Sequence, residues 1–138
     1  MSILNTLRKY LAEYDGLDLV LTDMTRKDAS SYAITQAAGG VVTKDILGNF
    51  TYQNSYVFLA KEHGKDEADR QGNYDFLESF CEWLEGRNEN GDLPELPEPY
   101  IPVSLEVSNV MLMDVEDGGA ATYQVQLQFT FEKRRNNV

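Results

Sequence analysis

The most regular pattern in the chain is an alternation of apolar and polar positions in the segment ATYQVQLQFTFE, residues 121–132. Successive side chains of a strand point to opposite faces of a sheet, so this pattern predicts a strand with one apolar and one polar face. The segment that begins at Ile101 also alternates, loses its phase near Asn109, and leads into a polar turn over residues 114–119. We therefore expect a C-terminal β-hairpin over residues 101–132, with a bulge near Asn109.

Two other segments repeat their apolar positions every three or four residues, which predicts amphipathic helices. The first helix is expected over residues 3–14, with Ser2 as its N-cap and Gly16 as its stop. The second is expected over residues 73–86, with Asn73 as its N-cap and Gly86 at its end. Their apolar stripes are expected to pack against the core.

The connections between these elements differ in character. Residues 17–62 favour strands, with two segments joined by a glycine turn at Gly39-Gly40 and a tyrosine-rich, central strand over residues 51–62. Residues 87–102 contain all four prolines of the chain. Because proline lacks a backbone donor, this part is expected to form a proline-rich loop or an arm at a sheet edge.

Together these elements predict a single domain over residues 1–138 with an α+β fold. We expect a mainly antiparallel sheet of four to five strands, with two amphipathic helices packed on one face. A parallel sheet would need helical crossovers between successive strands, and the order of elements does not supply them.

The composition of the chain mainly excludes or disfavours classes of binding site. The chain has 23 acidic and 12 basic residues, a net charge of −11, which disfavours sequence-independent binding of nucleic acid. Cys81 is the only cysteine and His63 the only histidine, so an intramolecular disulfide, a cysteine-based zinc site and a histidine-rich metal site are excluded. We expect an intracellular chain without a signal peptide or a membrane span.

Motifs that would indicate catalysis are missing. The acidic turn at residues 114–119 does not fit a calcium loop, because Val125 stands where a bidentate glutamate is required. No glycine-rich phosphate-binding motif occurs either. We expect no catalytic residue, no cofactor and no metal ligand, and a hydrolase whose carboxylates meet only in the folded chain is the enzymatic alternative.

Three basic residues end the alternating strand of this acidic chain and begin an expected basic tail over residues 133–138. Such a tail either keeps the C-terminus soluble or pairs with an acidic patch on a neighbouring subunit. The glutamines on the polar face of the strand offer uncharged hydrogen-bonding groups, suited to subunit contacts or to plain solvation. The candidate interface residues are Gln124, Gln126, Gln128, Lys133, Arg134 and Arg135.

Several segments carry a family resemblance in combination with the N-terminal helix. They are KDILG at residues 44–48, NYDFLESFCEWL at 73–84, LPELP at 93–97 and ATYQVQL at 121–127. In this combination the chain resembles small proteins of tailed-phage and prophage structural modules, the minor capsid or tail-completion proteins, and is similar to tail terminators. The resemblance covers about residues 3–132 and carries no residue-level binding motif.

The resemblance implies an α+β protein that assembles into a ring, with a hexamer as the candidate size, at the head-proximal end of the tail tube. There it would stop tube polymerisation and help to join tail to head, without catalysis. Its partners would be copies of itself, tail-tube protein and head-connector protein, with no specific nucleic acid and no membrane. Its location would be the virion, after assembly in the host bacterial cytoplasm. The alternative is a small cytoplasmic module that binds a ligand on the tyrosine-rich sheet face.

Overall fold

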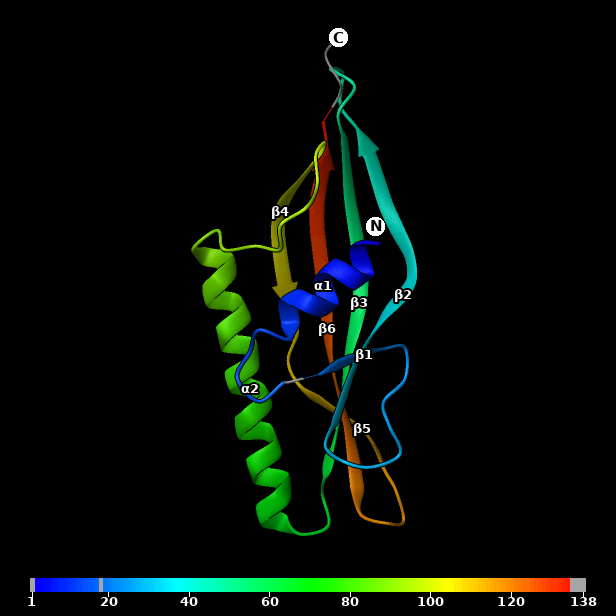
Figure 1. Cartoon of the computed structure of the whole chain (residues 1–138), viewed down its shortest axis with the longest axis vertical. Coiled ribbons are helices and arrows are strands. Elements are labelled where there is room, and N and C mark those ends of the chain that lie inside the picture. Colours follow the sequence, from blue (N-terminus) through cyan, green and yellow to red (C-terminus); the bar gives the residue numbers. More distant parts are fainter. Residues whose placement is uncertain (1, 18, 135–138) are drawn as a thin grey trace.

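Two helices pack on one face of a long, twisted sheet in the computed structural model, which describes residues 2–17 and 19–134 (Figure 1). The elements in chain order are α1 (Ile3–Leu11), β1 (Val20–Thr22), β2 (Ser31–Lys44), β3 (Phe50–His63), α2 (Glu67–Glu89), β4 (Tyr100–Val107), β5 (Met111–Val115) and β6 (Ala120–Lys133). The predicted α+β class is therefore confirmed.

The sheet order is β1-β2-β3-β6-β4, and β5 also pairs with β6. Strands β3 and β6 pair along their full length, from Phe50 opposite Lys133 to His63 opposite Ala120. Strand β4 pairs with the second half of β6 and β5 with its first half, so both lie on the same edge of the sheet.

The prediction of four to five strands was too low, and the sheet is mixed. Six strands are present in the described residues, and the short β1 runs parallel to the start of β2, while the other pairings are antiparallel. The predicted hairpin over residues 101–132 holds three strands, because the chain leaves the ladder between Val107 and Met111. The sequence has no turn motif that would predict the pairing of β1 with β2, because an irregular loop connects these two strands.

The core lies between the helices and the apolar face of the sheet. Alternate residues of β6 point into it, as the sequence pattern predicted, and Phe129 is 0% exposed. Helix α1 contributes Leu7 and Leu11, and α2 contributes Phe80 and Leu84. Strong alternation on β6 therefore reflects one-sided coverage of the sheet.

Helix α2 begins six residues before the predicted start. Asp66 is its N-cap and accepts the backbone N–H of Asp69 at 2.8 Å, whereas Asn73 lies inside the helix. The first turns carry polar side chains, so they lack the apolar period that marks the rest of the helix. The Asn73 amide instead donates to the His63 carbonyl oxygen at 2.8 Å and to the Tyr123 hydroxyl at 3.2 Å, which joins α2 to β3 and β6.

The predicted glycine turn at Gly39-Gly40 is wrong. Strand β2 continues through this region with a bulge between Gln36 and Gly40, because glycine permits a bulge as readily as a turn. The chain turns instead after Lys44, where the Asp45 carboxylate accepts the backbone N–H groups of Leu47 and Asn49, each at 2.9 Å. Hydrogen bonds to Asn49 and Leu47 lower the pKa of Asp45.

The end of α1, the end of α2 and the loop after α2 also differ from their predicted bounds. Helix α1 keeps Ser2 as its N-cap, whose hydroxyl accepts the Asn5 backbone N–H at 3.0 Å, but it ends at Leu11 instead of residue 14. Helix α2 continues to Glu89 and β4 begins at Tyr100, which shortens the predicted loop over residues 87–102. Near the end of α2, the Asn88 side chain accepts the Leu105 backbone N–H at 2.9 Å, which ties this end of the helix to β4.

A substitution on β6 tests the placement of its two faces. Phe129→Asp should destabilise the fold by more than ~4 kcal/mol, because it places an unpaired carboxylate in the core. The neighbouring Gln128→Asp, on the exposed face, should change the free energy of unfolding by no more than about 0.5 kcal/mol. Chemical denaturation monitored by circular dichroism measures both, and similar losses in the two variants would contradict the assigned faces.

The thiol of Cys81 tests the packing of α2. Burial, with smaller contributions from Glu85, Glu78 and Glu82, raises the pKa of this thiol to about 11. At about pH 8 such a thiol is roughly a thousandth ionised, against about a quarter for a thiol of ordinary pKa. Alkylation of the folded chain should therefore be slower than that of the unfolded chain by about two orders of magnitude, as followed by mass spectrometry. Equal rates would show that Cys81 is accessible.

Candidate functional site

The sheet face turned away from the helices carries uncharged polar side chains along its centre. The predicted glutamines Gln124, Gln126 and Gln128 share this face on β6. Gln126 lies opposite Val57 and Gln128 lies opposite Ser55 on β3. The sequence therefore placed these side chains on the correct face.

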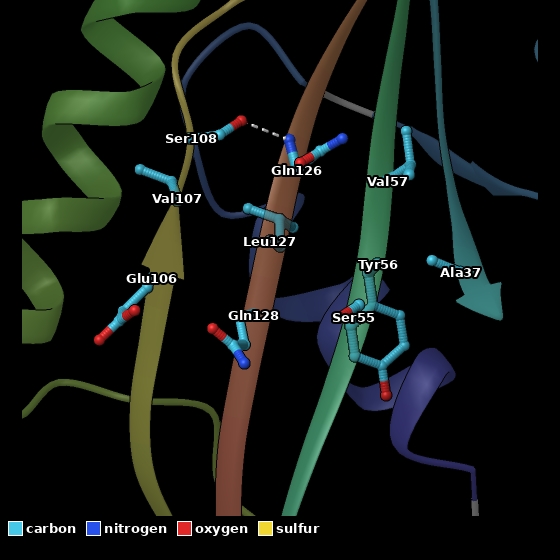
Figure 2. Close-up of a pocket in the computed structure, with 10 residues that line it drawn as sticks. All are labelled: Ala37, Ser55, Tyr56, Val57, Glu106, Val107, Ser108, Gln126, Leu127 and Gln128. Atoms are coloured by element: carbon cyan, nitrogen blue, oxygen red, sulfur yellow. Dashed lines mark hydrogen bonds between the residues drawn. The ribbon is translucent and has the colours of Figure 1, made fainter. Parts of the chain in front are cut away.

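A groove of about 510 Å³ crosses this face where four strands lie side by side (Figure 2). Its lining comes from β2, β3, β6 and the end of β4. The lining residues are Ala37, Ser55, Tyr56, Val57, Glu106, Val107, Ser108, Gln126, Leu127 and Gln128. Two of the three candidate glutamines, Gln126 and Gln128, thus meet at the groove.

Irregular pairing on both sides explains why the sheet is hollowed here. On one side, β4 leaves the ladder at Ser108, whose N–H donates to the Gln126 carbonyl oxygen at 2.9 Å and whose hydroxyl accepts the Gln126 N–H at 2.9 Å (Figure 2). On the other side, the β2 bulge between Gln36 and Gly40 interrupts the pairing with β3. Bulged edges bend away from regular strands, which leaves the space between them open.

The chemistry of the groove is that of hydrogen bonding. Glutamine amides both donate and accept, and the hydroxyls of Ser55 and Ser108 do the same. Glu106 is the one charged side chain in the lining.

In the described part of the chain, no three His, Cys, Asp or Glu side chains gather as a metal site would require. Among the described helices, none has the length and apolar character to cross a membrane.

The predicted basic residues lie apart from the glutamines. Lys133 is the last residue of β6, and its ammonium nitrogen lies 5.9 Å from the centre of the Tyr100 ring. The Arg134 N–H donates to the Pro99 carbonyl oxygen at 3.1 Å, and Arg135 lies outside the described residues. The predicted basic tail over residues 133–138 is therefore wrong at Lys133, because this residue is still paired with β3 and β4. Lys133 is roughly 23 Å along the strand from Gln126, so the candidate residues form two separate surfaces.

Sequence reasoning missed an apolar surface on β5. All five residues of this strand are exposed, including Met111 at 51%, Leu112 at 42%, Met113 at 54% and Val115 at 51%. The available signal was the apolar run after Asn109, where the alternation loses its phase. Without alternation, both faces of a strand are apolar, and neither can be assigned to the core.

Substitutions in the groove should weaken association without affecting folding. The double variant Gln126→Arg with Gln128→Arg should unfold like the unmodified chain, because both side chains are exposed. Association with tail-tube protein, a partner expected from the resemblance, should fall at least ~10-fold if this face is a contact, since an unpaired cation is costly to desolvate. Analytical ultracentrifugation measures the association, and Gln71→Arg on the outer face of α2 is the matched control. Unchanged association in the double variant would show that the groove is only solvated.

The comparisons with known proteins add no family to this geometry. No protein-family model matches the chain, and no curated protein matches it.

Proposed function

We propose that this chain is a structural protein of a tailed phage or prophage particle, which acts by assembly and without catalysis. It forms a ring at the head-proximal end of the tail tube, stops tube polymerisation and helps to join tail to head. Its partners are copies of itself, tail-tube protein and head-connector protein.

The observation that carries this proposal is the uncovered polar face of the sheet. Both helices pack on the opposite face, so the glutamine-lined groove is available to another molecule (Figure 1). Interfaces of this kind use hydrogen bonds and trapped water as well as apolar contact. The resemblance of the sequence to tail-completion proteins points to the same class of function.

The geometry favours this function over ligand binding on the tyrosine-rich face. Tyr56 and Tyr123, on β3 and β6, are each 1% exposed and belong to the core beneath the helices. Burial raises the pKa of the Tyr56 hydroxyl. The Asn54 amide donates a hydrogen bond to this hydroxyl at 3.0 Å, which offsets part of that rise. Helix α2 covers the Tyr123 ring through Tyr74, so a ligand could reach that ring only by displacing the helix. The groove is already open, which makes it the better candidate for binding.

Removal of the gene from its phage or prophage tests the proposal. Without the protein, tails should grow beyond their normal length and remain unjoined to heads, because nothing caps the tube. Electron microscopy of particles measures tail length and the fraction with heads, and expression of the chain in trans should restore both. Normal, joined particles in the deletion would contradict the proposal.

A further inference from the structure

We infer that strand β5 is the acceptor edge for the β2–β3 hairpin tip of a second copy of this chain. The hairpin tip is the segment of residues 40–46, and the acceptor edge is residues 111–117. This contact rests on the ring assembly proposed above and names the two surfaces that would join neighbouring copies.

The acceptor edge has the properties of an unfinished sheet edge. Within the described part of the chain, β5 pairs with β6 alone, and the backbone groups on its outer side face away from that partner. The adjacent β4 is protected by α2, because the Asn88 side chain accepts the Leu105 N–H at 2.9 Å. An apolar edge strand without such cover tends to pair with another chain.

The hairpin tip offers a matching surface at the opposite corner of the sheet (Figure 1). Strand β1 pairs with β2 only from Tyr32 to Ile34, so residues 40–44 pair with β3 alone among the described residues. Val42 is 52% exposed and Ile46 is fully exposed. Each copy therefore has an apolar edge on β5 and a second apolar edge at its hairpin tip.

Charge also distinguishes the two surfaces. At the end of the sheet that carries the hairpin tip, Lys44 and Lys133 pair with the two sides of Phe50, and Arg134 follows Lys133. Asp45 and Glu132 offset part of this positive charge. The acceptor edge is acidic at its end. Glu116 is paired with Lys61 at 3.1 Å, while Asp114 and Asp117 form no ion pair with a described residue. The small basic excess at this end and the acidic acceptor edge favour contact between unlike ends of two copies and disfavour the contact of two like ends.

Strand direction is compatible with this contact. Strands β2 and β6 both run antiparallel to β3, and β5 runs antiparallel to β6, so β5 and β2 have opposite directions. Two copies in the same orientation would thus place β2 of one antiparallel to β5 of the next. Such a head-to-tail contact joins different patches, so it repeats, and it closes into a ring when the rotation between copies permits.

Two single substitutions test the contact. Ile46→Asp removes the hairpin tip surface and Met113→Asp removes the acceptor edge, and each variant alone should be monomeric. An equal mixture of the two should form a dimer and nothing larger, because only one intact tip and one intact edge are present. Light scattering coupled to size exclusion should give twice the single-chain mass of 15.6 kDa for the mixture, and a larger species for the unmodified chain.

The control is Met24→Asp, which places the same charge on a side chain that is 75% exposed outside both surfaces. It should assemble like the unmodified chain, and thermal unfolding should be alike in all variants. Assembly that survives Ile46→Asp or Met113→Asp, or a mixture that stays monomeric, would overturn the contact and leave ring assembly standing. An unmodified chain that is monomeric even at high concentration and with tail tube present would overturn both.

Discussion

The full-length pairing of β3 with β6 is the constraint on which the other parts of this molecule depend. Each strand has 14 residues, and their ladder runs from one end of the sheet to the other. Because the pairing continues without a register shift, it holds the same face of both strands toward the helices along its length. Strands β2, β4 and β5 pair directly with β3 or β6, and β1 joins the sheet through β2. Both ends of the pair carry the turns and edges that remain exposed.

One-sided coverage follows from the number of helices. Two helices can cover only part of a sheet of this length, so they bury the central apolar face and leave the reverse face to polar residues (Figure 1). Beyond the reach of the helices, aromatic rings pack on one another. The Tyr52 and Phe131 rings are stacked with centres 5.1 Å apart, which extends the core toward the hairpin tip. The exposed apolar residues of β5 and of the tip lie outside this arrangement.

The secondary structure could be predicted best where one principle controlled the pattern. Strand β6 is covered on one face over its whole length, so its alternation was complete. The sequence predicted only the later part of helix α2, because its first turns face solvent and its cap at Asp66 precedes a polar stretch. The bulge in β2 was mistaken for a turn, since two glycines satisfy the backbone needs of either.

The sequence by itself determined the two faces of β6, the apolar stripes of both helices and the absence of cysteine and histidine clusters, because these depend on periodicity and residue type. Only the tertiary structure decided that Gln126 and Gln128 border a groove, that Lys133 is held at a distant end, and that β5 is an uncovered edge. These properties depend on which strands are neighbours and where a helix stops covering the sheet. Contacts between residues far apart in the chain set both, and local patterns do not encode them.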